Sequence, residues 1–263
     1  MQNFSQTQLD RLADIVRKTR PLFENTELLS SVHQKGQADF VTDVDYQVQS
    51  FLLSELAAFR PDIQFMGEEK DNSNIDFSGL VWILDPVDGT TNLIHRFRQS
   101  SVSLALAENH TIIAGIIYNP YTDELFSALK SCGSSLNGQP VTVSSCASLS
   151  DSLVSVGTSP YIHDYADWNF RRAKEIFLRC QDIRRLGSAA LDLAYVACGR
   201  TDGFYEIYLS PWDYAAGLLL IEEAGGRVTD FSGNPPDCSA PSSILATNGS
   251  VHEELRELLE QHP

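Results

Sequence analysis

The sequence predicts an α+β half followed by an α/β half, packed together as one unit. The chain has 263 residues, of which 43% are hydrophobic, which suits one large unit or two closely packed halves. Three consecutive apolar segments in the first half have the alternation and turns of an antiparallel meander. After Asn137 and Gly138, the expected strands and helices alternate instead. We therefore expect an N-terminal half with an antiparallel sheet over residues 1–143 and a C-terminal half over residues 144–263.

The first half begins with two expected helices. Apolar residues recur at helical spacing over residues 8–23 and again over residues 43–59, and Pro61 ends the second helix. A short strand is expected over residues 63–66. After a polar loop, residues 80–84 form a continuous apolar run that is typical of a buried strand. The segment that follows contains a proline and a glycine, so we expect no regular helix or strand across it.

The remaining elements are predicted from the same periodicities and from turn residues. Strands are expected over residues 101–107, 111–118, 124–128, 153–156, 183–186, 203–208 and 244–247. Helices are expected over residues 164–180, 189–198, 212–224 and 251–259.

Charge and composition exclude several classes of function. The formal net charge is −16 and there is no basic run, so direct binding to nucleic acid is not expected. No apolar run is long enough to span a membrane, and the polar N-terminus predicts no signal peptide. The five cysteines include no C-x-x-C pair, which favours reduced thiols and a cytoplasmic protein. An acidic protein that handles an anionic substrate needs added cations.

Two carboxylates flank a turn directly after the buried strand over residues 80–84. Asp85 ends that strand, and Asp88 follows across a turn that contains Pro86. Such a turn can direct both carboxylates and the Val87 carbonyl into one small volume, which suits a hard divalent cation. The alternative is that the two aspartates only cap a helix and shape the turn.

The next residues are suited to phosphate. Gly89 lacks a Cβ, so a ligand can approach the backbone closely, and Thr90 supplies a hydroxyl. A helix that begins near Thr91 would present free N–H groups, which bind phosphate.

Other acidic residues have a structural and a functional interpretation. Glu68 and Glu69, taken alone, are a solvated pair between a strand and a loop. Asp213 alone is a first-turn acid that favours the dipole of its helix. Thr42 and Asp45 fit a capping box.

Taken together, these motifs resemble the inositol monophosphatase family of Mg²⁺-dependent, lithium-sensitive phosphatases. The resemblance rests on Gly67-Glu68-Glu69, on residues 82–92, and on Pro211-Trp212-Asp213 with Ala215-Ala216-Gly217. Further likeness lies at Lys35, Ala38-Asp39, Val41-Thr42, Asp45, residues 185–190 and residues 203–206. The resemblance covers about residues 35–235. It implies a layered αβαβα sandwich of the sugar phosphatase type, and members are usually homodimers.

The resemblance also implies which residues hold metal. Glu68, Asp85 and the Val87 carbonyl would hold a first Mg²⁺, and Asp85, Asp88 and Asp213 a second. A third, looser ion would contact Glu68. Without such ions, four carboxylates within about 4–6 Å would repel each other by several kcal/mol. None of the six histidines lies in a metal-spaced pair, so a zinc hydrolase is not expected.

The same resemblance implies residues for catalysis and for substrate. Asp45 and Thr90 would orient and deprotonate the attacking water, with Glu68 also at the reaction centre. Gly89 and Thr90 would bind the phosphate, beside Asp88 and Asp213. The alcohol part of the substrate would contact Gly187, Ser188, Ala189 and Glu206.

We therefore expect a Mg²⁺-dependent phosphatase for a small phosphorylated substrate, with myo-inositol 1-phosphate as the first candidate. Histidinol phosphate, fructose 1,6-bisphosphate, NADP and 3′-phosphoadenosine nucleotides remain alternatives, because related enzymes cleave them. A regulatory protein-binding role on the same fold also remains open. The sequence departs from the family pattern at Leu93 and at Arg96 and Arg98. The two arginines are consistent with surface residues, with a dimer contact or with recognition of a second anionic group.

Overall fold

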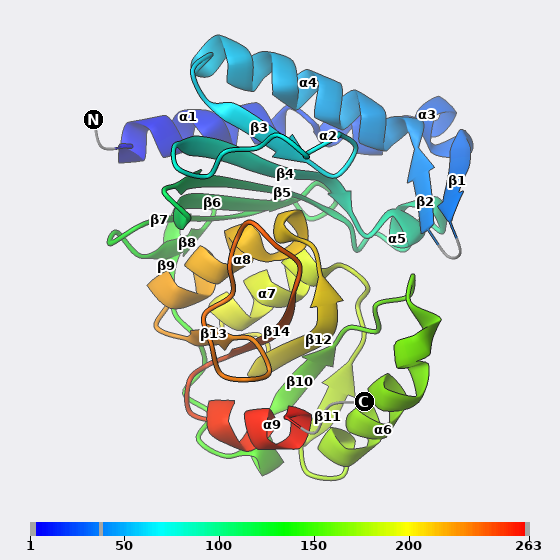
Figure 1. Cartoon of the computed structure of the whole chain (residues 1–263), viewed down its shortest axis with the longest axis vertical. Helices are drawn as coiled ribbons and strands as arrows, with labels where there is room; N and C mark the ends of the chain where they lie inside the picture. Colours follow the sequence, from blue (N-terminus) through cyan, green and yellow to red (C-terminus); the bar gives the residue numbers. More distant parts are fainter. Residues whose placement is uncertain (1–3, 37–38, 261–263) are drawn as a thin grey trace.

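The computed structural model describes residues 4–36 and 39–260. Helices and sheets alternate through it in the order αβαβα (Figure 1), so the predicted layered sandwich is confirmed. The outer helices on one side are α1 (Gln6–Arg17) and α4 (Asp43–Phe59). The central helices are α7 (Ala189–Ala197) and α8 (Pro211–Glu223). On the far side lie α6 (Ala166–Phe177) and α9 (His252–Leu259).

The first sheet has seven strands, and only its first pair is parallel. In spatial order they are β3 (Gln64–Gly67), β4 (Leu80–Asp88), β5 (Ser101–Glu108), β6 (Thr111–Asn119), β7 (Glu124–Leu129), β8 (Ser134–Leu136) and β9 (Gln139–Val141). The predicted antiparallel meander is therefore present in β5, β6 and β7.

The second sheet has five strands and is mixed. In spatial order they are β11 (Asp182–Arg184), β10 (Leu153–Val156), β12 (Gly203–Leu209), β14 (Ser242–Thr247) and β13 (Arg227–Thr229). Strand β10 is parallel to both neighbours, whereas β14 is antiparallel to both of its own. In the sequence, all strands of the first sheet precede residue 143 and all strands of the second sheet follow it. The division of the chain into two halves at this residue stays a prediction.

Short elements fill the rest of the chain. They are α2 (Arg20–Phe23), α3 (Thr26–Ser30), α5 (Thr90–Ile94), the 3-10 helices η1 (Leu149–Asp151) and η2 (His163–Tyr165), and a hairpin of β1 (Val32–Gly36) and β2 (Asp39–Thr42). Ala38, which contributed to the family resemblance, lies outside the described residues. In the described chain, no helix is both long and apolar enough to cross a membrane.

The helix expected over residues 8–23 is interrupted. It ends as α1 at Arg17, where Lys18 is the C-cap, and resumes as α2 with a proline near its start. Proline has no backbone N–H and its ring crowds the preceding turn, which explains the break. The helix expected over residues 164–180 likewise begins with η2 and ends at Phe177.

One prediction about the acidic segment is wrong. Strand β4 does not stop at Leu84 but continues through Pro86 to Asp88. Its pairing with β5 shifts between Asp85 and Asp88, as in a β-bulge. A bulge leaves a residue without a ladder hydrogen bond, so proline is tolerated there.

The central helix α8 lies unusually close to the first sheet. A Cβ added to Gly115 of β6 would lie 2.8 Å from the carbonyl oxygen of Ala216 and 3.2 Å from its Cα. Both neighbours are backbone atoms of α8, which cannot rotate away. The glycine therefore sets how closely α8 approaches the sheet.

We expect Gly115→Ala to destabilise the fold by about 1–3 kcal/mol, because an added methyl group forces the helix and sheet apart. Chemical denaturation monitored by circular dichroism measures this. Gly79→Ala is the matched control, since a Cβ there meets no atom within 4 Å. Equal stability of the two variants would contradict the close approach.

Candidate active site

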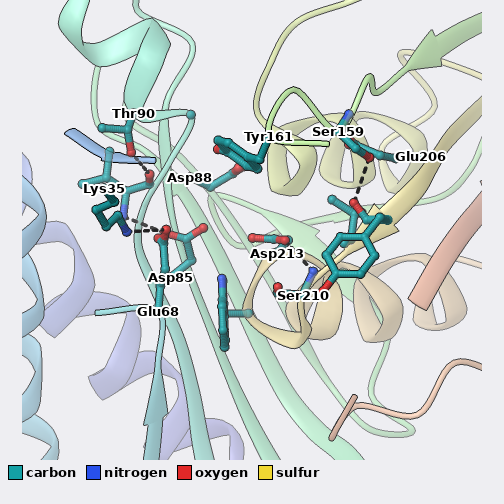
Figure 2. Close-up of a pocket in the computed structure, with 15 residues that line it drawn as sticks. Lys35, Glu68, Asp85, Asp88, Thr90, Ser159, Tyr161, Glu206, Ser210 and Asp213 are labelled. Atoms are coloured by element: carbon teal, nitrogen blue, oxygen red, sulfur yellow. Dashed lines mark hydrogen bonds and ion pairs between the residues drawn. The ribbon is translucent and has the colours of Figure 1, made fainter. Parts of the chain in front are cut away.

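A cavity of about 310 Å³ opens where the two sheets and α8 meet, and it holds most of the predicted site residues (Figure 2). The predicted residues that line it are Glu68, Asp85, Val87, Asp88, Gly89, Thr90, Glu206 and Asp213. They come from the end of β3, from β4 and α5, from β12 and from α8. An adjoining cavity of about 230 Å³ is lined by Gly187, Ser188 and Ala189 and shares Asp88, Glu206 and Asp213.

Two of the carboxylates use one oxygen for local structure. The Asp85 Oδ1 accepts a hydrogen bond from the Val87 N–H at 2.9 Å, which shapes the bulge of β4. The Asp213 Oδ2 accepts one from the Ser210 N–H at 2.7 Å, at the start of α8. Within the described part of the chain, no hydrogen bond reaches the second oxygen of either carboxylate. Each residue therefore satisfies its backbone and keeps one oxygen for a ligand.

Asp45 also uses one carboxylate oxygen for local structure and directs the other to the site. Its Oδ2 accepts hydrogen bonds from the Thr42 N–H at 2.8 Å and the Thr42 hydroxyl at 2.6 Å, so the capping box is present. Its Oδ1 accepts from the Thr90 hydroxyl at 3.1 Å. Thr90 is also 3.1 Å from the Val87 carbonyl, and its single proton can serve only one acceptor at a time. The structural and functional interpretations of Asp45 are therefore both compatible with the fold.

Asp88 is held by the start of α7. The Ser188 hydroxyl donates to its Oδ2 at 2.5 Å, and the Ala190 N–H donates to the same oxygen at 2.8 Å. The Ala189 N–H is 3.3 Å from Oδ1. Ser188 also caps α7. The segment over residues 187–189 therefore reaches Asp88 as well as the adjoining cavity.

The carboxylates share a poorly hydrated site and repel each other. Burial, followed by the charges of its carboxylate neighbours, raises the pKa of Asp85 well above its usual range, and the same causes act on Asp213. Burial raises the pKa of Asp88 to about 6 and that of Glu68 to about 7. Desolvation penalises the charged form of an acid, and like charges add to the penalty.

Among the described residues, Lys35 brings a positive charge to this cluster from the β1–β2 hairpin. The Lys35 Nζ lies 3.2 Å from the Glu68 Oε1 and 2.5 Å from the Glu69 Oε1. This single positive charge offsets only part of the negative charge of the cluster. The sequence includes Lys35 in the family resemblance but predicts no role for it, because no local pattern indicates that the hairpin folds over the carboxylates.

The donor set fits a hard divalent cation. Every side chain in the cluster offers oxygen, the shared charge is negative, and Asp85 and Asp213 each have an oxygen without a hydrogen bond from the described residues. Among residues 4–36 and 39–260, no three acidic, histidine or cysteine side chains converge closely enough to enclose one ion as they stand.

Glu206 is held at the opposite side of the cavity from Lys35 (Figure 2). Its Oε1 accepts a hydrogen bond from the Ser159 N–H at 2.6 Å and lies 3.2 Å from the Ser159 hydroxyl. Burial raises its pKa to about 7. A Cβ on Gly157 would lie 2.0 Å from its Oε2, so only glycine leaves room for this carboxylate.

The two unusual arginines lie away from both cavities. Arg96 and Arg98 have backbone φ angles of 53° and 60°, in the left-handed region, on the loop after α5. Neither is among the residues that line either cavity. Recognition of a second anionic group at this site is therefore not supported by their position.

Similarity to known proteins agrees with this geometry. The family model of the inositol monophosphatase family matches residues 1–263. A Synechocystis inositol-1-monophosphatase is 39% identical over 89% of this chain and 82% of its own length. The Nus factor SuhB of Escherichia coli K12 is 40% identical over 76% of this chain and 75% of its own. A solved Thermotoga maritima IMPase superposes with a TM-score of 0.88 at 34% identity, over 97% of this chain and 98% of its own. The chain therefore belongs to the inositol monophosphatase family of phosphatases, as its motifs predicted.

Proposed function

We propose that this protein hydrolyses a small phosphate monoester with Mg²⁺, and that myo-inositol 1-phosphate is its first substrate candidate. The observation that carries this proposal is the single cavity shared by Glu68, Asp85, Asp88 and Asp213, beside the Asp45–Thr90 pair. A negative cluster of this kind repels phosphate unless cations neutralise it. The names of relatives such as the Synechocystis enzyme support the choice of substrate.

The metal ligands we propose are residues of β4 and α8 and the residue after β3 that line this one cavity. Glu68, Asp85 and the Val87 carbonyl would hold one Mg²⁺, and Asp85, Asp88 and Asp213 another, with a looser third ion at Glu68. Bound Mg²⁺ supplies positive charge for the phosphate and lowers the pKa of water.

The proton acceptor we propose is Asp45, acting with the Thr90 hydroxyl. Burial raises the pKa of Asp45 to about 6, so it stays a carboxylate at neutral pH yet is more basic than an exposed aspartate. Its Oδ2 is fixed by Thr42, which directs Oδ1 toward Thr90. The hydroxyl of Thr90 and the Gly89 backbone would then position the water and the phosphate.

The alcohol part of the substrate would contact Glu206, which can accept hydrogen bonds from hydroxyl groups, and the segment over residues 187–189.

A panel of phosphate esters tests which substrate the protein hydrolyses, with Mg²⁺ present and phosphate release as the readout. The panel contains myo-inositol 1-phosphate, histidinol phosphate, fructose 1,6-bisphosphate, NADP and 3′-phosphoadenosine 5′-phosphate. We expect the inositol ester to be turned over fastest and Li⁺ to inhibit by competing with Mg²⁺. Fast turnover of another ester without turnover of inositol phosphate would overturn the proposal that myo-inositol 1-phosphate is the substrate.

We propose a homodimer in the cytoplasm for the native protein. Size-exclusion chromatography with light scattering tests the first part of this, and cell fractionation tests the second.

A second candidate role is regulatory protein binding, because several relatives are named as Nus factors. The variant described below separates the two roles. If the cellular role survives the loss of hydrolysis, protein binding becomes the primary function.

We expect Asp213→Asn to lower kcat/KM by at least about 100-fold, since even loss of an outer-shell partner of a metal ligand costs 10–100-fold. The same change removes one like charge from a buried cluster, so the metal-free protein should melt at an equal or higher temperature. Steady-state kinetics and thermal melting in EDTA measure the two effects.

Asp76→Asn, in the exposed loop before β4, is the matched control and should change neither quantity. Full turnover by Asp213→Asn, or full turnover by the unmodified protein in excess EDTA, would contradict the metal-dependent mechanism.

We expect the apparent affinity for Mg²⁺ to fall as the pH drops from 8 to 6. Burial raises the pKa of Glu68 to about 7 and that of Asp88 to about 6, so the metal-free site takes up protons across this range. Mg²⁺ requires the deprotonated carboxylates and must displace those protons. Isothermal titration calorimetry at the two pH values measures the change in Kd and the proton release. A Kd that is equal at both values, with no proton release, would be incompatible with the buried ligand set.

A further inference from the structure

Two tyrosines, Tyr161 and Tyr208, line the catalytic cavity, and no packing or hydrogen bond of their side chains among the described residues explains their position there. Tyr161 is 57% exposed and Tyr208 is 39% exposed. In the described part of the chain, neither ring packs against another aromatic ring and neither hydroxyl has a hydrogen-bond partner. Both residues line the cavity of about 310 Å³ that holds the acidic cluster.

The two tyrosines are joined to Glu206 through Ser159. Tyr208 follows Glu206 by two residues on β12, so both side chains can border the same cavity. The Ser159 hydroxyl donates to the Tyr208 carbonyl at 3.0 Å, while the Ser159 N–H donates to Glu206. The segment that carries Tyr161 is therefore fastened to the strand that carries Tyr208.

The backbone before Tyr161 is held in an uncommon conformation. Ser159 has a φ of 42°, in the left-handed region, which non-glycine residues rarely adopt. Pro160 follows it and restricts the next torsion. Strained backbone persists where the surroundings impose it, and it concentrates at ligand-binding segments. Here the strain places Tyr161 over the cavity, where Figure 2 shows the ring reaching from the Ser159 segment toward Asp88.

Tyr161 borders both parts of the site. It lines the cavity with the acidic cluster and also the adjoining cavity of about 230 Å³, next to Gly187 and Ser188. The hydroxyl of a tyrosine keeps its proton at neutral pH and can donate a hydrogen bond. A substrate that reaches from the acidic cluster toward Glu206 therefore passes beside this ring.

The chemistry of this wall suits one class of alcohol. An aromatic ring offers a flat apolar face with a polar tip, which matches the C–H face and the hydroxyl edge of a ring polyol or sugar. Glu206 adds an acceptor for those hydroxyls at the same wall. A short acyclic alcohol has no continuous apolar face and gains little from the rings.

We propose that Tyr161 and Tyr208 are specificity-determining residues, which pack against the alcohol part of the substrate and select phosphate esters of ring alcohols over those of short acyclic alcohols. This inference rests on the proposed phosphatase function and adds the class of leaving group. The two tyrosines contribute to binding of the alcohol and not to hydrolysis of the phosphate.

The test compares myo-inositol 1-phosphate with glycerol 2-phosphate, both with Mg²⁺, for the unmodified protein, Tyr161→Leu, Tyr208→Leu and the double variant. We expect each leucine variant to raise KM for the ring ester about 3- to 10-fold, as loss of an aromatic contact does, with kcat within about twofold. For glycerol 2-phosphate both constants should stay within about twofold. The corresponding phenylalanine variants keep the flat face and should retain most of the preference for the ring ester.

Phe170→Leu is the matched control, because this aromatic residue is 70% exposed on α6 and outside the cavity; it should change neither ester. Thermal melting and Mg²⁺ titration of each variant show that the fold and the acidic cluster are intact. Equal changes for the two esters, or no change for either, would overturn the inference while leaving the phosphatase proposal in place. No hydrolysis of either ester by the unmodified protein would overturn the inference, and no hydrolysis of any ester in the panel above would overturn the phosphatase proposal as well.

Discussion

The structure is organised around four carboxylates of like charge between two sheets, of which Asp85 and Asp88 are buried and Glu68 and Asp213 are half-buried. Glu68 follows β3, Asp85 and Asp88 lie on β4, and Asp213 lies on α8, and all four border one cavity. Bringing such charges out of water is costly, and each one raises the pKa of its neighbours. Other features of the fold offset part of this unfavourable free energy. They are the bulge of β4, the hydrogen bonds from the start of α7, and the close packing of α8 on β6. The remaining cost is what a divalent cation would remove on binding.

In Asp45, Asp85 and Asp213, one carboxylate oxygen accepts a hydrogen bond from the backbone, and the other oxygen points to the site or is left for a ligand. This arrangement explains how acidic side chains can be built into the folded structure. Asp45 and Asp213 satisfy a helix N-terminus with one oxygen, and Asp85 satisfies a turn in the same way. A carboxylate has about four acceptor sites, so local structure does not exhaust it. Helix capping orients the side chain before any ligand arrives, which reduces the entropy lost on binding. The structural and the functional interpretations of these residues are therefore two halves of one arrangement, and the first supports the second.

Much of the fold and the acidic cluster could be predicted from the sequence, because both depend on strong local patterns. The helix α4 agrees with its periodicity at both ends, and the order of strands in the meander follows from adjacent turns. The β1–β2 hairpin and β13 were missed, since β1 is exposed along its length and both lack a distinctive apolar pattern. The prediction that no strand continues through Pro86 was wrong, because a bulge depends on pairing with the partner strand. The local sequence does not show that pairing. Lys35, Ser159, Tyr161 and Tyr208 were not assigned roles, because only the tertiary fold brings them to the cavity.

This contrast distinguishes the residues that we propose for the reaction from those that we propose for substrate selection. The carboxylates lie on or at the ends of packed strands and helices, where their positions follow from the core, so a motif of a few residues is enough to identify them. Tyr161 lies on a loop and Tyr208 near the end of β12, where pairing with β14 becomes irregular. Residues in such positions change without disturbing the core, and the same reaction can then act on a different alcohol. Membership of the family therefore supports the phosphatase reaction more strongly than it supports any one substrate. We propose that the identity of the alcohol is determined at the wall around Glu206.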